Sequence, residues 1–205
     1  MLFTVGITGG ICTGKSEVTK TCQASGYSVV YADELGHNAY HVGTNIYLEI
    51  IERFSTNILL DNHEINRSAL GDIVFSDETK LKKLQQIVWP YIKSEIKRKI
   101  NLHKVNKEKV LIIEAAVLFE AGWDCYMDEI WVVRCSKDLQ MERLTKERGL
   151  STEAALKRIS AQDISQFNKT GSYKMIENSQ DLSKLRDRTI ELINSIENKL
   201  NESFN

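Results

Sequence analysis

Residues 9 to 16 read Gly-Gly-Ile-Cys-Thr-Gly-Lys-Ser, and they directly follow the apolar run Leu2-Phe3-Thr4-Val5-Gly6-Ile7. The apolar run predicts a strand over residues 2–8, and the residues behind the loop predict a helix over 15–25. The loop is therefore Gly-x4-Gly-Lys-Ser between a strand and a helix, which is the pattern of a phosphate-binding P-loop. A chance glycine-rich turn is the alternative, and the two flanking elements disfavour it.

Each part of this loop has a physical role. Gly9 and Gly14 permit backbone conformations that strain other residues, so consecutive N–H groups can point at a phosphate. Lys15 supplies a positive charge for the outer phosphates, and the Ser16 hydroxyl is placed to bind Mg²⁺. The N-terminus of the following helix faces the same anion. The residues expected to bind a nucleoside triphosphate are Gly9, Gly10, Ile11, Cys12, Thr13, Gly14, Lys15, Ser16 and Glu17.

Composition excludes several other classes of protein. The chain has 205 residues with 42% apolar and 27% charged side chains, as in a single globular domain. Its net charge of −1 gives no indication of a nucleic-acid or membrane surface, and no apolar run approaches the roughly 20 residues that cross a bilayer. The four cysteines and four histidines have no metal-ligand spacing. We expect a cytoplasmic protein with reduced thiols that acts on small molecules.

Strand and helix patterns alternate along the chain. Strands are predicted at 27–31, 110–113, 130–133 and 174–176, and the second and third of these are nearly continuous apolar runs. This alternation predicts an α/β fold with a parallel sheet covered by helices on both faces. A long helix is predicted over 181–200.

Two further segments are predicted to be helical. From residue 34 to about 104 only helical patterns appear, and this segment is the natural place for a second substrate. Within it, Pro90 predicts the start of a new helix after Trp89. Residues 136–162 predict two helices that meet near Gly149-Leu150-Ser151, with Ser151 at a helix start. We interpret Arg143, Arg148 and Arg158 in this segment either as a solvated helix face or as a lid over phosphates.

Two acidic residues follow predicted strands, Asp33 after the second and Glu114 after the third. Phosphoryl transfer needs a carboxylate that orients or accepts the proton of the attacking hydroxyl, and Asp33 fits this role. Asp33 could also cap a helix that starts at Glu34, and the two roles are compatible. Asn168-Lys169-Thr170-Gly171 lacks the aspartate of a guanine-binding signature, so a GTPase is disfavoured.

Several stretches in order along nearly the whole chain resemble the dephospho-CoA kinase family. The loop resembles the family's Thr-Gly-Gly-Ile-x-x-Gly-Lys-Ser, and Trp89-Pro90 takes the place of its His-Pro. The runs 32–40 and 114–123 are especially similar to the kinase domain of the animal bifunctional CoA synthase. The other matching positions are 65–70, 74–75, Arg143, Gly149-Leu150-Ser151 and Gln162.

The resemblance implies a P-loop kinase fold with a five-stranded parallel sheet of order 2-3-1-4-5. It implies one domain over 1–205, with a core at 1–33, 105–136 and 164–205, a helical CoA-binding region at 34–104, and a lid at 137–163. The implied reaction transfers the γ-phosphate of ATP to the ribose 3′-hydroxyl of dephospho-CoA and yields CoA and ADP. ATP and Mg²⁺ are the implied cofactors, and a monomer or weak homo-oligomer is expected.

The resemblance also implies roles for residues of this sequence. Lys15, Asp33 and Arg143 would be catalytic, with Asp33 as the base, and Ser16 would bind the metal. Thr8, Asp33, Arg67, Glu114 and Leu118 would bind the substrate. Two other functions remain open at this point: a nucleoside or nucleotide kinase of the same architecture, and a regulatory nucleotide-binding module with a degraded site.

The sequence departs from the family pattern at four places. Cys12 replaces a usual glycine, which is tolerable only if its φ is negative. Glu17 places a carboxylate near the phosphates or beside the positive end of a helix. Glu114 replaces the usual aspartate, and Glu147 stands at the position of the family's second lid arginine, with Arg148 next to it.

Overall fold

The computed structural model describes residues 2–160, 173–179 and 181–202. The chain divides into two compact units, one formed by Met1–Val30 with His103–Asn205 and the other by Tyr31–Leu102. The first unit carries the P-loop, and the second carries Asp33 and Arg67.

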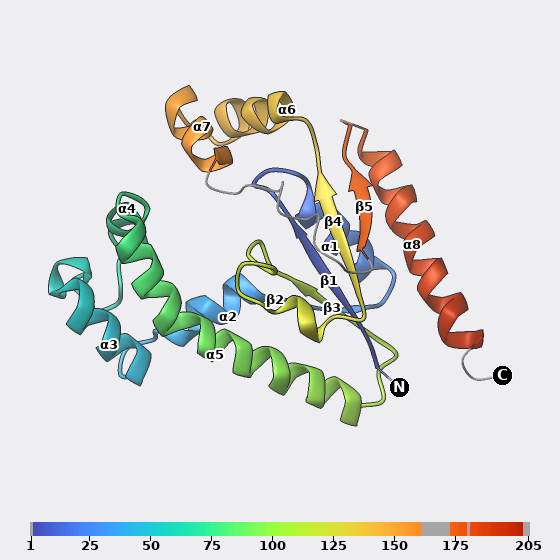
Figure 1. Cartoon of the computed structure of the whole chain (residues 1–205), viewed down its shortest axis with the longest axis horizontal. Helices are drawn as coiled ribbons and strands as arrows, with labels where there is room; N and C mark the ends of the chain where they lie inside the picture. The colour runs from blue at the N-terminus through green and yellow to red at the C-terminus, as the bar shows by residue number, and fades with distance from the viewer. Residues whose placement is uncertain (1, 161–172, 180, 203–205) are drawn as a thin grey trace. The chain divides into compact units, whose positions relative to one another are not determined.

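A five-stranded sheet forms the framework of the unit that carries the P-loop. Its strands are β1 (Phe3–Gly9), β2 (Ser28–Tyr31), β3 (Val110–Glu114), β4 (Glu129–Arg134) and β5 (Tyr173–Glu177). Their order is β2-β3-β1-β4-β5 (Figure 1), so the predicted order 2-3-1-4-5 is confirmed. β1 pairs in parallel with both β3 and β4, and β4 pairs in parallel with β5. The register places Ile7 opposite Glu114 and Gly9 opposite Val133, so the P-loop leaves the sheet at the carboxyl ends of its strands.

One face of the sheet is covered by α1 (Lys15–Ala24) and α8 (Leu182–Glu202), which contact each other along their lengths. α8 buries residues three or four positions apart, as expected of a helix with one apolar face. Figure 1 shows α8 alongside β5. The core between these helices and the sheet is formed by Val5, Ile7, Val18, Cys22, Val110, Ile112, Trp131, Val133, Ile176, Leu185, Leu192, Ile193, Ile196 and Leu200.

The second unit is helical, as predicted for this part of the chain. Its elements are α2 (Ala32–Ala39), α3 (Asn45–Phe54), the short η1 (Thr56–Ile58), α4 (Arg67–Phe75) and most of α5 (Glu78–Val105). Side-chain caps start two of the helices: Thr44 accepts from the Tyr47 N–H, and Asn66 accepts from the N–H groups of Ser68 and Ala69. Such caps satisfy backbone donors that the helix itself leaves unpaired.

The predicted helix start at Pro90 is wrong, because α5 continues through this proline. A proline inside a helix removes one hydrogen-bond donor and costs stability. The apolar residues on either side keep one spacing, with Val88, Ile92, Ile96 and Ile100 all buried. Burial of this continuous stripe explains why the helix persists across Pro90.

The segment after β4 forms α6 (Lys137–Glu142), a π-helical turn η3 (Arg143–Glu147) and α7 (Thr152–Ser160). The predicted boundary near residues 149–151 is confirmed: Gly149 has φ 65° and the Ser151 side chain caps α7 through the Ala154 N–H. π-Helical turns inside helices frequently occur at functional sites. The predicted lid residues 161–163, including Gln162, lie outside the described residues.

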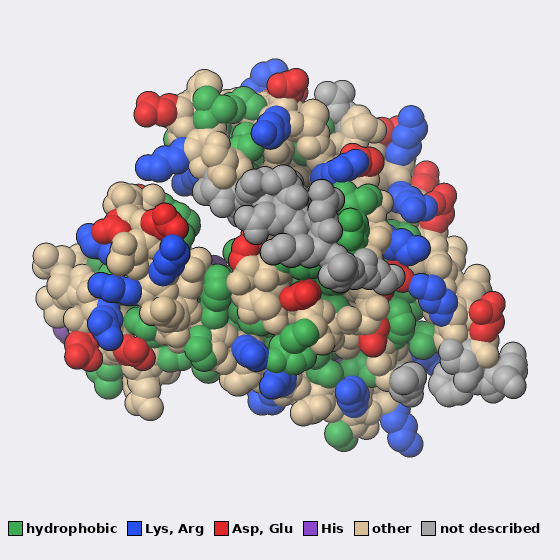
Figure 2. Space-filling view, viewed as in Figure 1, with side chains coloured by type: hydrophobic (Ala, Val, Ile, Leu, Met, Phe, Trp, Pro, Cys, Tyr) green, Lys and Arg blue, Asp and Glu red, His purple; other side chains and the backbone are tan. Residues whose placement is uncertain are grey.

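The surface shown in Figure 2 carries basic and acidic side chains interspersed with one another. This pattern agrees with the net charge of −1. Among the residues that the structure describes, no helix is long and apolar enough to cross a membrane. The cytoplasmic location remains a prediction.

Candidate active site

The backbone of the P-loop requires glycine at both ends. Gly9 has φ 149°, and a Cβ atom on it would lie 2.1 Å from the Val133 carbonyl oxygen. Gly14 has φ 106°, and a Cβ atom on it would lie 2.3 Å from Nδ2 of Asn178. Both positions therefore exclude a side chain for steric reasons as well as for their φ angles. The conformational roles predicted for these glycines are confirmed.

Cys12 has a positive φ, so its side chain strains the backbone where glycine would not. Its φ is 56°, in the left-handed region. Non-glycine residues other than asparagine and aspartate adopt this region at a cost. The surrounding contacts must therefore hold Cys12 in a strained conformation, and the loop retains its shape at the expense of some stability.

Lys15 folds back over the loop that precedes it. Its Nζ atom donates to the carbonyl oxygens of Gly9 and Gly10 at 2.9 and 3.0 Å. The Thr13 hydroxyl also donates to the Gly10 carbonyl, at 2.9 Å. The ammonium group is thus already positioned within the loop that would surround the phosphates.

The next three carbonyl groups of the loop each accept a hydrogen bond from a distant side chain. Nε2 of Gln140 donates to the Ile11 oxygen at 2.8 Å. Nη1 of Arg143 donates to the Cys12 oxygen at 2.8 Å. Nδ2 of Asn178 donates to the Thr13 oxygen at 2.8 Å. The loop is therefore fixed from outside by α6, by η3 and by the residue that follows β5.

The three arginines that the sequence grouped together have different environments. Arg143 is partly buried and contacts the P-loop, whereas Arg148 and Arg158 are exposed. The solvated-face interpretation therefore suits Arg148 and Arg158. Of these three arginines, only Arg143 contacts the loop at which phosphate binding is predicted.

Ser16 and Glu17 lie in the first turn of α1, which begins at Lys15. The Glu17 carboxylate pairs with Arg186 of α8, with Oε1 lying 2.5 Å from Nη2 and 2.7 Å from Nε. Arg186 thus compensates the negative charge of Glu17. The positive end of the α1 dipole also stabilises this charge, because Glu17 lies in the first turn of the helix. Ser16 is exposed beside the loop, so its hydroxyl is accessible to a metal ion.

The remaining predicted residues of this unit lie around the ends of β1 and β3. Glu114 is partly buried at the end of β3, in register with Ile7 of β1. The Thr8 hydroxyl is buried and donates to the Ala116 carbonyl at 3.4 Å. Leu118 is fully buried, and a Cβ atom on Gly6 would lie 2.8 Å from it. Leu118 therefore has no exposed surface with which to contact a substrate here.

Asp33 and Arg67 lie in the helical unit, and the charges of both shift the pKa of His37. The pKa of the His37 imidazole is lowered, first by partial desolvation and then by the Arg67 charge, while Asp33 and Glu34 oppose this shift. The Arg67 guanidinium also lies 6.0 Å from the ring centre of Tyr40, a cation–π contact. Burial raises the pKa of the Tyr40 phenol, and the Arg67 charge lowers it. The His37 imidazole therefore lies within the electrostatic influence of the Asp33 carboxylate and the Arg67 guanidinium.

The alternative that Asp33 caps a helix starting at Glu34 is wrong. α2 begins at Ala32, so Asp33 is its second residue and Tyr31 holds the capping position. The Asp33 side chain is exposed. It is therefore available for the role predicted from its place after β2.

Gln140 and Asn178 are site residues that the sequence analysis missed. Gln140 stands three positions before Arg143, a spacing that places two side chains on one face of a helix. Asn178 directly follows the last strand, β5, at the same carboxyl edge of the sheet where Glu114 ends β3. The spacing of Gln140 and Arg143 can be seen in the sequence. The loop carbonyl to which each side chain donates cannot.

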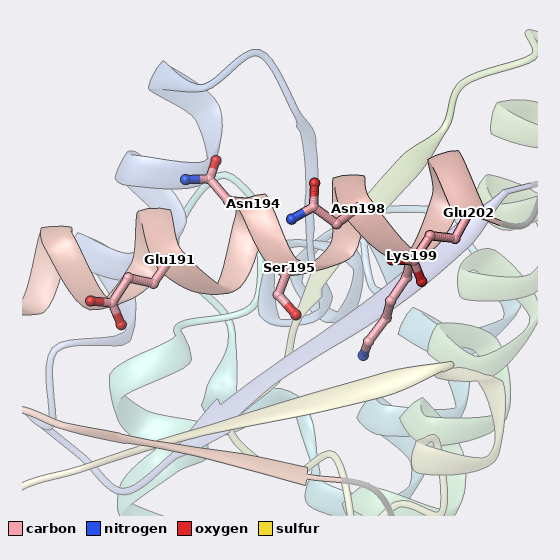
Figure 3. A pocket seen from close by; sticks show the side chains of 6 residues that line it. All are labelled: Glu191, Asn194, Ser195, Asn198, Lys199 and Glu202. Carbon is pink, nitrogen blue, oxygen red and sulfur yellow. The ribbon is translucent and has the colours of Figure 1, made fainter.

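A hollow along α8 shares no residue with the P-loop. Its six lining residues, Glu191, Asn194, Ser195, Asn198, Lys199 and Glu202, all belong to this helix (Figure 3). Lys199 extends from α8 towards the sheet, where Nζ lies 2.6 Å from the buried Glu129 carboxylate. This lysine has a structural role, because its charge is paired with the buried Glu129 carboxylate.

Comparison with known proteins identifies the family. The profile of the dephospho-CoA kinase family matches residues 3–184. The chain belongs to the dephospho-CoA kinase family. It is 32% identical over 197 residues to a dephospho-CoA kinase of Lactobacillus johnsonii, covering 96% of this chain and 99% of that one. It is 35% identical over 196 residues to one of Oryza sativa subsp. japonica, covering 96% and 85%.

A solved structure supports the same conclusion. The structure of the dephospho-CoA kinase from Campylobacter jejuni matches with a TM-score of 0.70 and 25% identity, and covers 96% of this chain and 98% of that one. The fold class predicted from the sequence is confirmed. So is the prediction of a dephospho-CoA kinase, an ATP-dependent transferase that phosphorylates an alcohol group.

Proposed function

We propose that this chain transfers the γ-phosphate of ATP to the ribose 3′-hydroxyl of dephospho-CoA and releases CoA and ADP. The observation that carries the proposal is the P-loop itself, whose carbonyl groups from Gly9 to Thr13 are all held by protein donors. In a trans peptide the N–H group points away from the carbonyl, so the bonds to Ile11, Cys12 and Thr13, whose donors lie outside the loop, turn the N–H groups of the following residues away from those donors. That arrangement suits a chain of phosphates.

Lys15 and Arg143 are proposed to stabilise the transferred phosphoryl group. Lys15 would exchange its contacts with Gly9 and Gly10 for contacts with the outer phosphates, because carbonyl oxygens are weaker partners than phosphate oxygens. Arg143 is held beside the loop at Cys12. Its charge would offset the charge that builds up on the equatorial oxygens during transfer once the guanidinium turns from the Cys12 carbonyl towards the phosphates.

The residues present also fit a Mg²⁺ ion, which we propose as the second cofactor. In the described part of the chain, no three His, Cys, Asp or Glu side chains are grouped as an all-protein metal site needs. Mg²⁺ in kinases is held instead by one or two protein oxygens, phosphates and water. The exposed Ser16 hydroxyl and the Glu114 carboxylate at the end of β3 are such oxygens. When bound, the ion would neutralise charge on the phosphates and orient them.

In the helical unit, Asp33 is proposed to orient the acceptor hydroxyl and take its proton. Arg67 is proposed to bind the acceptor, since an exposed guanidinium at the first turn of α4 can pair with phosphate oxygens of dephospho-CoA. Thr8 and Leu118 are less favoured as substrate contacts, because both are buried.

Asp33→Asn tests the assignment of the base. The variant keeps the size of the side chain and removes its ability to accept a proton. We expect ATP affinity within about twofold of wild type and CoA formation reduced by roughly 10²–10⁴-fold. Asp72→Asn, which changes another carboxylate of the helical unit, serves as the control. Turnover that survives in Asp33→Asn assigns the base to another group.

A further inference from the structure

Two nearly buried amides, Gln140 and Asn178, carry no role in the reaction described so far. Their exposed fractions are 3% and 2%. Each donates to one carbonyl of the P-loop, Gln140 to Ile11 and Asn178 to Thr13, both at 2.8 Å. Arg143 donates to the carbonyl between them, that of Cys12, also at 2.8 Å. Three consecutive peptide groups are thus held by three side chains from outside the loop.

The direction of each peptide group follows from these bonds. A trans peptide is planar, so fixing the carbonyl of one residue fixes the N–H of the next residue in the opposite direction. The bonds to Ile11, Cys12 and Thr13 therefore orient the N–H groups of Cys12, Thr13 and Gly14. These N–H groups belong to the part of the motif that surrounds phosphates.

Further contacts lock the Asn178 amide in place. Its Oδ1 atom accepts from Nη2 of Arg143 at 3.4 Å, which leaves Nδ2 directed at the Thr13 carbonyl. A Cβ atom on Gly14 would lie 2.3 Å from Nδ2, so the amide rests directly against the loop backbone. Arg143 and Asn178 therefore act as one connected pair on adjacent carbonyls.

We propose that Gln140 and Asn178 are positioning residues, which hold the P-loop peptides with their N–H groups directed at the nucleotide's phosphates before the nucleotide binds. This proposal deepens the proposed function and rests on the P-loop as the phosphate site. Neutral amides suit the task because they orient carbonyls without adding charge beside the phosphates. They also offset the strain of Cys12, whose φ of 56° needs support from its neighbours.

The test uses Gln140→Met and Asn178→Ala, singly and together, in the full chain. Neither variant adds a charge, and each removes one donor to the loop. Affinities are measured for two probes, ATP and inorganic tripolyphosphate, which has the phosphates without the nucleoside. We expect each single variant to weaken both probes by roughly the same factor, about five- to tenfold, with a larger loss in the double variant. The KM for dephospho-CoA should stay within about twofold of wild type.

Thr4→Val is the matched control. Thr4 is also buried at 4% exposure in β1, and its hydroxyl lies 2.9 Å from the Tyr126 carbonyl oxygen and 2.8 Å from the Asp128 carboxylate, which share its one proton, away from the loop. Its loss should lower Tm without changing the affinity for either probe. The probe affinities of Gln140→Met and Asn178→Ala are compared with that of Thr4→Val at a similar loss of Tm. The comparison separates a general loss of stability from a change in the loop.

Three outcomes would overturn the proposal. Unchanged affinity for both probes shows that the amides do not shape the phosphate site. Weaker ATP binding with unchanged tripolyphosphate binding shows that they act on the nucleoside instead. An equal loss in Thr4→Val shows that stability alone decides the affinity. Failure of the proposed function is a separate result: wild-type protein that binds both probes but forms no CoA.

Discussion

Nη1 of Arg143 lies 2.8 Å from the carbonyl oxygen of Cys12, so a residue of the segment after β4 is fastened to the P-loop. The same guanidinium reaches Oδ1 of Asn178 at 3.4 Å. One cation thus links the loop, the π-helical turn η3 and the end of β5. Its loss should affect both the shape of the loop and the charge at the phosphates.

Arg143→Met should therefore lower kcat/KM by about 10²–10³-fold, the usual effect of removing one charge-stabilising donor. Arg148→Met is the matched control, since Arg148 lies five residues on, is exposed and should leave kcat/KM within about twofold. Steady-state kinetics with ATP and dephospho-CoA measure both. Equal losses in the two variants would place the effect in the segment as a whole.

The strain at Cys12 predicts that glycine at this position is more stable than alanine. Cys12→Gly should unfold at a Tm about 1–3 °C higher than Cys12→Ala, because glycine adopts φ 56° without cost while alanine keeps the strain and lacks the thiol. The pair of variants isolates the backbone contribution from that of the thiol. Differential scanning calorimetry gives the two values. An alanine variant at least as stable as the glycine variant contradicts the strained conformation.

Glu129 is a buried carboxylate whose charge is compensated within the structure. It is 2% exposed, accepts from Nε1 of Trp131 at 2.9 Å and pairs with Lys199 at 2.6 Å. Lys199→Met should lower the free energy of unfolding by about 2 kcal/mol, below the full cost of breaking a buried pair because Lys199 is half exposed.

Lys184→Met provides the control for this ion pair. Lys184 lies on the same helix and pairs with the exposed Asp181 at 3.9 Å. Such surface pairs contribute between zero and about 1 kcal/mol. Denaturant unfolding measures both variants. If the two lose the same free energy, Glu129 does not depend on Lys199.

Cys22 predicts a loss of stability at alkaline pH. Burial raises the pKa of its thiol from 9.0 to about 12. Above pH 9 the thiol ionises in the unfolded chain but stays protonated in the native protein. The contribution of Cys22 to the free energy of unfolding is therefore full below pH 9 and declines as the pH rises towards 12.

The stability difference between wild type and Cys22→Ala should therefore shrink by about 1 kcal/mol between about pH 8.5 and 10. Unfolding curves recorded at several pH values measure it. Cys125→Ala, which removes an exposed thiol, corrects for other alkaline effects. A difference that stays constant over this range would mean that the Cys22 thiol is not kept protonated by burial.

The sequence predicted the parallel sheet because its signals are local. The apolar runs at β1, β3 and β4 and the glycines of the loop determine their own backbone, and the strand limits agree within about two residues. The helix start predicted at Pro90 was wrong because the preference of proline for a first helical turn is local. The buried apolar stripe from Val88 to Ile100 extends across it. In that case burial outweighed the missing hydrogen bond.

The supports of the loop could not be predicted in the same way. Gln140 and Asn178 meet carbonyls that are 129 and 165 residues distant in the chain. Nothing local in either residue indicates such a partner, since only the tertiary fold brings α6 and the end of β5 to the loop. Family resemblance supplied Arg143, but its carbonyl partner came only from the structure.

The central claim is tested most directly by measuring CoA formation. Purified protein is incubated with Mg-ATP and either dephospho-CoA, a nucleoside or no acceptor, and ADP and CoA are quantified together. We predict one CoA for each ADP with dephospho-CoA, and ADP release at least about tenfold slower with a nucleoside or without an acceptor. ADP release that does not depend on dephospho-CoA, or that is faster with a nucleoside, would contradict the account.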